Sequence, residues 1–358
     1  MKKLMAGIVA CAMVFTLAAC GSSNGNNSGG GSEAGAGNKA DGDKKVYTIK
    51  LGHSDKSGDS SIIDWTARQF ADLASQYSDG QLKVEIYPSN QLGDQLEQMR
   101  SVQNGTQEMV QGSVNNFGTF APSVNYLTLP YIFKGSEQAR DAIDKLWDKN
   151  NEFGVEQAGM RFLLWTDAGF RAITSDKNHP VRSLADLKGL KMKVPPNKIF
   201  ESAFQAFGSE TVVLPFSEAF TAMQQGLVHA QENAYTTART EHYYEVHKYI
   251  TDIEWMYTIS AFAISETYFQ TLPKELQDAL VKAGKEASQL ERDRFDQLME
   301  DDIKFLEEKG MERLGKPEDI DQWIELGRSV WPQAYESIGG GSAAKGEEIV
   351  NEVLSIIE

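Results

Sequence analysis

The residues best suited to binding chemistry are an arginine, a lysine and an asparagine, each placed near the end of an apolar run. Arg171 follows a glycine and an aromatic residue, Lys193 alternates with apolar residues along a predicted strand, and Asn233 ends the run Gln-Glu-Asn. A guanidinium is the natural bidentate partner of a planar carboxylate, and an ammonium adds a compact positive charge. This combination favours a site for a carboxylate.

Each of these residues also has a purely structural explanation. Arg171 can form an ion pair with a neighbouring acid such as Asp167, and Lys193 can be a solvated strand residue. Asn233 can belong to a turn, because asparagine is common there. Phe216, at the mouth of a predicted helix, is as readily a core aromatic as a ligand contact. The sequence leaves these alternatives open.

A second group of polar residues follows the strands predicted earlier in the chain. Ser54, Asp55, Ser113 and Asn116 offer hydroxyl, carboxylate and amide groups. This set suits a ligand with several hydroxyls, such as a sugar acid, better than a bare dicarboxylate. Each residue alone is as readily a capping or turn residue.

His53 and Gln231 complete the predicted ligand-binding set. His53 directly precedes Ser54, and Gln231 opens the Gln-Glu-Asn run. His53 and His229 lack any tight metal-ligand spacing, so we expect no metal, and nothing in the sequence indicates a cofactor.

An exported hydrolase is the main alternative from a different class of function. The sequence contains no Gly-x-Ser-x-Gly elbow and no His-Glu-x-x-His run, and its cysteines are limited to Cys11 and Cys20. Its scattered carboxylates are typical of any acidic protein. We therefore predict no catalytic residues and no enzymatic activity.

Binding residues at strand ends require α/β domains, because ligands of open α/β sheets lie beyond the carboxyl ends of the strands. A length of 358 residues fits two domains. Twice along the chain a predicted helix is followed by a glycine, a strand and a polar segment. The first polar segment is residues 112–116; the second is residues 231–233, after a predicted strand at 227–229. Two similar domains facing each other would explain this repetition, although any βαβ unit has the same pattern.

Two further segments are expected to connect the domains. Residues 256–265 are rich in strand formers and could cross back to the first domain. Residues 273–309 are strongly helical, and a helix of that length spans roughly 50 Å, unless Gly284 interrupts it.

The N-terminus has the pattern of an export signal. Lys2 and Lys3 precede an apolar run that ends in Leu17-Ala18-Ala19-Cys20. A transmembrane anchor needs about 20 apolar residues, and this run is shorter. The pattern resembles a bacterial lipoprotein signal, in which residues 1–19 are removed and Cys20 is lipidated. An ordinary signal peptide or a short anchor is the alternative.

Residues 20–45 contain mostly glycine, serine, asparagine and alanine after the cysteine, which predicts a flexible tether. The protein is therefore expected at the outer face of the cytoplasmic membrane. Acidic residues outnumber basic ones by 51 to 35, for a net charge of −16. Such a surface repels nucleic acids and anionic membranes, so an anionic ligand requires a locally basic site.

Six short motifs are distributed along the chain from about Val46 to the C-terminus. They are Gln91-Leu92-Gly93, Leu129-Pro130-Tyr131, Gly169-Phe170-Arg171, the run from Asp186 to Pro195, Pro215-Phe216-Ser217-Glu218, and Gln231-Glu232-Asn233 followed by Tyr244-Glu245-Val246. Any one of them is weak, whereas six in this order are highly specific. In these motifs the chain resembles the solute-binding proteins of tripartite ATP-independent periplasmic (TRAP) transporters, the DctP-like family.

The resemblance implies a two-domain periplasmic-binding-protein-like α/β fold with crossing hinge strands and a long domain-spanning helix. The predicted first domain comprises residues 46–168 and 259–300. The second comprises residues 169–258 and 301–358, including the C-terminal helices. The resemblance also implies that the protein binds a small organic acid and delivers it to the membrane subunits of a TRAP transporter. We expect a monomer, although the sequence does not determine the oligomeric state. A ligand sensor for a membrane kinase would have the same fold and site, and the sequence does not separate the two.

The resemblance further implies roles for individual residues. Arg171 would be the family's carboxylate-pairing arginine, Asn233 would support the same group, and Phe216 would pack on the ligand body. Position 193 is usually arginine in the family and is lysine here. Because lysine lacks the rigid fork of arginine, we expect Lys193→Ala to cost less affinity than Arg171→Ala.

Three other positions also depart from the family pattern. His229 and Ala230 replace the usual aspartate-glycine before the Gln-Glu-Asn run, and Ala234 replaces the usual proline after it. The bound acid and the coupling ion are not determined by the sequence.

Overall fold

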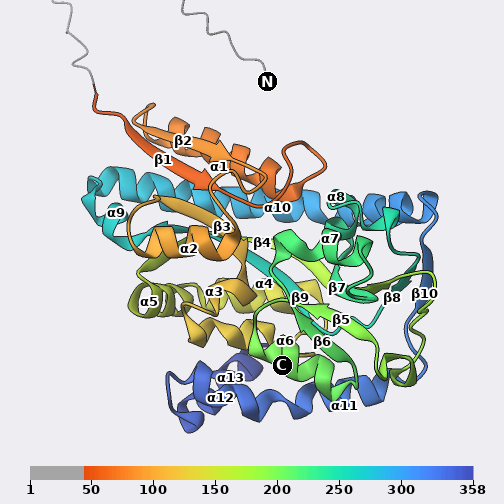
Figure 1. Cartoon of the computed structure of the whole chain (residues 1–358). Helices are drawn as coiled ribbons and strands as arrows, with labels where there is room; N and C mark the ends of the chain where they lie inside the picture. Colours follow the sequence, from red (N-terminus) through yellow and green to blue (C-terminus); the bar gives the residue numbers. More distant parts are fainter. Residues whose placement is uncertain (1–43, 358) are drawn as a thin grey trace, which may run out of the picture. The chain divides into compact units, whose positions relative to one another are not determined.

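The computed structural model describes residues 44–357 of the chain (Figure 1). The predicted signal peptide, Cys20 and nearly all of the predicted tether lie outside the described residues.

Ten strands form one mixed sheet. The main strand order is β2 (Leu82–Tyr87), β1 (Tyr47–Gly52), β3 (Met109–Ser113), β9 (Tyr257–Ser265), β4 (Met160–Ser175), β7 (Ala230–Ala234), β5 (Lys191–Val194) and β6 (Glu210–Val213). Two more strands, β8 (Tyr249–Thr251) and β10 (Glu312–Gly315), branch from β4. The β1–β2, β1–β3, β5–β6 and β5–β7 pairs are parallel, whereas β9 and β4 pair antiparallel with their neighbours.

The long strand β4 passes through both parts of this sheet. Residues 160–170 pair with β9, and residues 171–175 pair with β7. We call β1, β2, β3, β9 and residues 160–170 the first half of the sheet, and β5, β6, β7 and residues 171–175 the second half. The register shifts between Asp167 and Gly169. Gly169 adopts φ +84°, a conformation that glycine tolerates best. The predicted crossing strands are therefore present.

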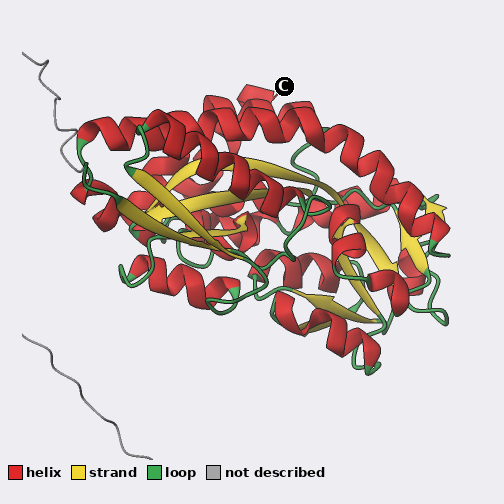
Figure 2. Cartoon of the chain, turned by 90° about the horizontal axis from the view of Figure 1, so that it is seen from above, coloured by secondary structure: helices red, strands yellow, loops and turns green. Residues whose placement is uncertain are grey.

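Helix α10 (Lys274–Glu308) runs unbroken along the molecule, as Figure 2 shows. It contains 35 residues and continues through Gly284. A Cβ atom at Gly284 would lie 2.0 Å from the carbonyl oxygen of Leu163 in β4. This glycine therefore allows close packing of the helix on the sheet and does not interrupt the helix.

Side-chain caps begin the first two helices. Ser61 caps helix α1 (Ile62–Tyr77) by accepting a hydrogen bond from the backbone N–H of Asp64. Asp94 and Glu97 form a capping box at helix α2 (Gln95–Gln103).

The remaining helical segments cover the sheet and fill its connections. They are α3 (Val114–Phe117), η1 (Pro122–Thr128), α4 (Ser136–Lys145), α5 (Trp147–Ala158), η2 (Leu184–Leu187), α6 (Lys198–Ala206), η3 (Phe216–Glu218), α7 (Ala219–Gln224), α8 (Tyr235–Thr240), η4 (Tyr243–Glu245), α9 (Glu266–Thr271), α11 (Ile320–Ser329), α12 (Trp331–Ile338) and α13 (Ala343–Ile357).

The last two helices pack on the first half of the sheet. Trp331 of α12 and Val350 of α13 belong to the same hydrophobic cluster as Phe162 of β4. The Ser123 hydroxyl also donates a hydrogen bond to the Ile338 carbonyl at 2.6 Å. The predicted domain ranges group these helices with the second domain; α12 also contacts helices α6 (Lys198–Ala206) and α11, so it packs against both parts of the molecule.

The Gln-Glu-Asn run lies inside a strand and not at the tip after one. The sequence pattern predicts a strand at residues 227–229, but β7 begins at Ala230 and ends at Ala234. Gln231 and Glu232 have side-chain partners on β4, whereas the side-chain oxygen of Asn233 accepts from the Ala234 backbone N–H. Alternation of polarity along one segment does not predict that such residues are buried.

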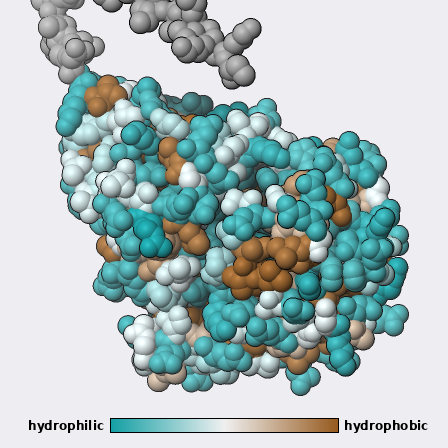
Figure 3. Space-filling view, viewed as in Figure 1, coloured by the Kyte–Doolittle hydropathy of each residue, from teal (hydrophilic) through white to brown (hydrophobic). Residues whose placement is uncertain are grey.

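Hydrophilic side chains cover most of the face shown in Figure 3, with one apolar patch near its centre. Among residues 44–357, the most exposed large hydrophobic residues are Val46, Val213 and Leu227. No helix in this range is both long and apolar enough to cross a bilayer.

Candidate functional site

A cavity of about 90 Å³ is lined by residues from both halves of the sheet. Residues at strand ends and in the loops that follow them contribute to its lining, and open α/β sheets bind their ligands at such positions. Eight of the ten predicted ligand-binding residues line it. They are Ser54, Asp55, Ser113, Asn116, Arg171, Lys193, Phe216 and Asn233.

Arg171 forms a buried ion pair with Glu232. Its Nε and Nη2 atoms both donate to the Glu232 carboxylate, and Nη2 also donates to the Glu232 carbonyl at 2.8 Å. The indole N–H of Trp255 donates to the same carboxylate at 3.2 Å. The alternative partner considered for Arg171, Asp167, pairs with Arg140 instead. The two-nitrogen face of the Arg171 guanidinium is thus already bound to a carboxylate of the protein.

The remaining guanidinium nitrogen of Arg171 is Nη1. Within residues 44–357 its one partner is the hydroxyl of Thr258, at a long distance of 3.4 Å. Thr258 also lines the cavity. Arg171 therefore offers a ligand one nitrogen and not the bidentate contact that the sequence suggests.

Lys193 differs from Arg171 because its charge has no partner. The side chain is 2 % exposed and lines the cavity. In the described part of the chain, no carboxylate oxygen lies within 4.0 Å of its Nζ and no hydrogen bond is formed. Burial lowers the pKa of Lys193 to about 8, against the attraction of Glu232. At neutral pH the site thus contains a buried ammonium without an anion, and the solvated-residue alternative does not hold.

Asn233 and Phe216 stand beside these cations. The side-chain oxygen of Asn233 accepts a hydrogen bond from the backbone N–H of Ala234 at 3.2 Å, and the Nδ2 group makes no hydrogen bond within the described residues. That arrangement leaves an amide donor for a ligand oxygen. Phe216 is half-buried and lines the cavity, so its ring is not part of the core.

The wall from the first half of the sheet is a network of amides and hydroxyls. Gln95 accepts hydrogen bonds from the backbone N–H of Ser113 at 3.2 Å and from the side chain of Asn116 at 2.8 Å. Asn197, from the second half, donates to the carbonyl of Asn115 and to the side chain of Asn125, both at 2.9 Å. The two walls thus touch beside the cavity.

Two carboxylates line the cavity on this side, Asp55 and the helix cap Asp94, whose side chain already accepts from the Glu97 backbone N–H. Burial raises the pKa of Asp55 to about 6, Glu241 adds to the rise, and His53 opposes it. Burial also raises the pKa of Glu241. At neutral pH Asp55 is an anion that faces the cavity.

Sequence reasoning missed two cavity residues with unsatisfied polar atoms. The buried side-chain oxygens of Asn90 and Gln111 have no hydrogen-bond partner in the described structure. Gln111 stands in the Glu-Met-Val-Gln run just before a predicted polar tip, which was the available signal. Further lining residues that were missed are Asn115, Thr236, Thr237, Thr240, Thr258 and Ser260.

The other two predicted residues do not line the cavity. His53 is fully buried, and its Nε2 contacts the Asp64 carboxylate at 3.2 Å. Gln231 donates to the hydroxyl of Thr174 at 2.7 Å within the core. Both support neighbouring structure. No group of three or more histidine, cysteine, aspartate or glutamate residues with metal-binding geometry occurs among the described residues.

Comparison with known proteins places these features in a family. The family model of the bacterial extracellular solute-binding proteins, family 7 (DctP), matches residues 52–338. The 2,3-diketo-L-gulonate-binding periplasmic protein YiaO of Escherichia coli is 28% identical over 267 residues, which cover 75% of this chain and 80% of YiaO.

Solved structures agree with this match. A TRAP periplasmic solute-binding protein from Rhodobacter sphaeroides is 37% identical, with a TM-score of 0.72, over 87% of this chain and 98% of that chain. The sugar acid binding protein DctPAm from Advenella mimigardefordensis, in complex with galactonate, is 26% identical, with a TM-score of 0.80, over 88% of this chain and 99% of that chain. These similarities confirm the predicted periplasmic-binding-protein-like fold. The chain belongs to the DctP family of bacterial extracellular solute-binding proteins, the receptors of TRAP transporters.

Proposed function

We propose that this receptor captures a small organic acid, preferably a sugar acid, and delivers it to the membrane subunits of a TRAP transporter. The observation that carries the proposal is the buried ammonium of Lys193. A buried charge without a partner costs several kcal/mol, and a ligand carboxylate would remove that cost. Arg171 Nη1 and Asn233 Nδ2 would donate to the same carboxylate, because both lack strong partners within the described residues.

The remainder of the cavity supports a ligand with hydroxyl groups. Its lining is rich in amides and hydroxyls, which exchange hydrogen bonds with a polyol. The similar proteins from Escherichia coli and Advenella mimigardefordensis carry names that refer to a sugar acid. We therefore favour sugar acids over simple dicarboxylates as ligands of this chain.

We propose that the protein binds and releases its ligand without changing it. The cavity groups assigned to the ligand are cations, amides, hydroxyls and one carboxylate, and each has a binding role. A ligand that touches both halves of the sheet favours a closed state by its higher affinity for that state. Release to a transporter requires that a partner favour the open state instead.

A ligand sensor for a membrane kinase is the second candidate function. It would use the same fold and the same cavity, so the site does not separate the two outputs. Genes for two membrane transporter subunits beside the gene for this chain would favour transport.

A thermal-shift screen tests the proposed ligand class. We expect sugar acids to raise the melting temperature, because a ligand at 100 times its Kd stabilises the folded protein by about 2.7 kcal/mol. Galacturonate and galactose make a matched pair, since the neutral sugar lacks the carboxylate. Equal shifts with both sugars, or no shift with any organic acid, would contradict an acid receptor.

We also propose that a lipid on Cys20 anchors the protein to the outer face of the membrane. The support is the lipoprotein-like run from Leu17 to Cys20, followed by the tether composition. We expect Cys20→Ala to release the protein from the membrane fraction or to leave the precursor uncleaved. Fractionation of cells followed by mass spectrometry of the N-terminus measures both. A correctly processed variant that stays in detergent-extractable membranes would rule out this anchor.

A further inference from the structure

We infer that the wall formed by Asp55, Asn90 and Gln111 selects acids whose far end bears hydroxyl groups and rejects acids with a second carboxylate. The receptor would thus take polyhydroxy monocarboxylates and exclude dicarboxylates. This inference rests on the proposed function and specifies the substrate class of the same site.

The first support comes from two buried oxygens that lack hydrogen-bond donors. Asn90 and Gln111 both line the cavity, and their side-chain oxygens are buried without a partner among the described residues. Leaving such an acceptor unsatisfied in a buried site is unfavourable. A ligand hydroxyl can donate to these oxygens and accept from the amide nitrogens beside them, whereas a carboxylate can only accept. The two side chains therefore favour a polyol, and the rejection of an anion rests on Asp55.

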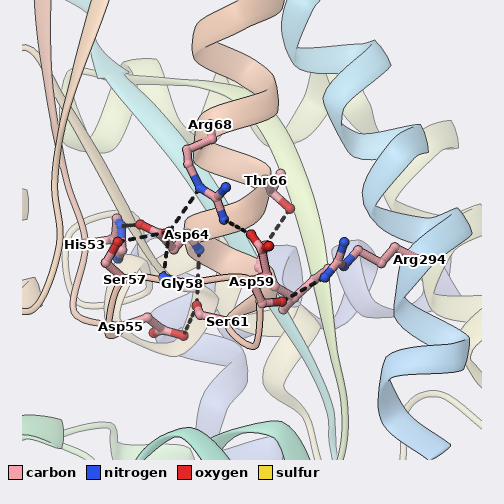
Figure 4. Close-up of polar contacts among 11 residues, drawn as sticks. His53, Asp55, Ser57, Gly58, Asp59, Ser61, Asp64, Thr66, Arg68 and Arg294 are labelled. Carbon is pink, nitrogen blue, oxygen red and sulfur yellow. Dashed lines mark hydrogen bonds and ion pairs between the residues drawn. The ribbon is translucent and has the colours of Figure 1, made fainter. Parts of the chain in front are cut away.

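The second support is Asp55, which can only accept hydrogen bonds when ionised. Ser61 accepts a hydrogen bond from the Asp64 backbone N–H at 3.1 Å and donates its single proton to Asp55 Oδ2 at 3.1 Å (Figure 4). The other carboxylate oxygen, Oδ1, makes no hydrogen bond within residues 44–357. Ser61 is thus a positioning residue that fixes Asp55 and leaves one of its oxygens for the ligand.

The loop that carries Asp55 is held in place by the Asp64 carboxylate. Asp64 accepts hydrogen bonds from the Ser57 hydroxyl at 3.3 Å, the Gly58 backbone N–H at 3.0 Å and Arg68 Nε at 3.2 Å (Figure 4). A loop with so many contacts cannot easily move Asp55 away from a ligand. An anion at the far end of a ligand would therefore meet a fixed negative charge.

The third support is that the cationic and acidic groups of the cavity come from different halves of the sheet. Lys193 comes from β5 in the second half, and the charges that act on it are those of Glu232 and Arg171. Asp55 follows β1 in the first half, and the charges that act on it are those of His53, Glu241 and Asp64. A dicarboxylate anchored at the cationic groups would bring its second carboxylate towards the acidic groups, where repulsion opposes binding.

Calorimetric titration with galactonate and galactarate tests this selection, because the two acids differ at one terminal carbon. We expect the purified wild-type protein to bind galactonate at least 100-fold more tightly than galactarate. Asp55→Asn should reduce this ratio at least tenfold, mainly by strengthening galactarate binding, since the amide removes the repulsion. Gluconate and glucarate provide a second pair with another stereochemistry.

Asp59→Asn is the matched control. Asp59 lies in the same loop, pairs with Arg68 at 2.6 Å and does not line the cavity, so its replacement should leave the ratio unchanged. A second variant, Gln111→Leu, should weaken galactonate about tenfold and leave hexanoate, a monocarboxylate without hydroxyls, unaffected.

The outcomes separate this inference from the proposed function. Aldarates or succinate that bind wild type as tightly as the aldonates would overturn the selection and leave the organic-acid receptor intact. An unchanged ratio in Asp55→Asn would also overturn it. If no organic acid binds, both the selection and the proposed function fail.

Discussion

Replacement of Lys193 by methionine is expected to weaken binding of the cognate acid at least 100-fold, about 2.7 kcal/mol. The ammonium is buried, lines the cavity and has no anionic partner within the described residues. Methionine has a similar length but no charge, so the carboxylate would lose its strongest partner. The ligand-free variant should be as stable as wild type or more stable, because an uncompensated buried charge has been removed. Calorimetry and urea denaturation measure the two effects.

The pH dependence of binding provides an independent check on Lys193. The pKa of Lys193 is about 8 in the ligand-free protein, so the ammonium is charged below that pH and becomes neutral above it. Affinity should therefore fall as the pH rises through about 8, and Lys193→Met should lack this fall. Lys198→Met, at an exposed lysine paired with Glu201, is the control and should retain wild-type binding. A loss of less than threefold in Lys193→Met would contradict the assigned anchor.

Replacement of Arg171 by alanine should reduce both stability and binding. Breaking a buried ion pair by removing one partner costs about 3 to 5 kcal/mol, and Glu232 would be left without its main partner. The freed Glu232 carboxylate already attracts Lys193, so it would compete with the ligand for the ammonium. We expect a hundredfold or greater loss of affinity, but by an indirect route.

A double variant separates the indirect route from direct contact. In Arg171→Met with Glu232→Gln, both charges of the pair are absent, so most of the lost stability and a large part of the affinity should return. Urea denaturation and calorimetry on the single and double variants give the comparison. A double variant that binds as weakly as Arg171→Ala would show that Nη1 itself makes the essential contact. The sequence-based order, in which Arg171 matters more than Lys193, would then hold.

The sequence by itself determined the class of fold and identified eight residues that line the cavity. The caps at Ser61 and Asp94 are set by the local sequence, because each joins residues three positions apart. Arg171, expected near the end of a strand, instead lies inside β4, which continues to Ser175. The long helix after Pro273 follows from local propensity and periodicity. The caps and this helix depend on neighbours along the chain, which a single sequence displays.

The partners of the charged residues were decided by the tertiary structure. Arg171 and Glu232 are 61 positions apart, and the β4–β7 register places Arg171 opposite Ala234, two residues from Glu232 on the same strand. Diagonal neighbours on paired strands are within reach of long side chains. The sequence cannot show that register, so it could not reveal that Glu232 occupies the arginine.

The same reasoning applies to the rest of the cavity. The ammonium of Lys193 is free for a ligand because Glu232 is already paired with Arg171 among the described residues. That pairing results from packing and not from residue type. Asn90 and Gln111 are important because their oxygens are buried without donors, and burial of a single atom arises only when distant segments come together. The residue types able to bind an acid were present in the sequence, whereas strand register and packing determined which of them remain free to do so.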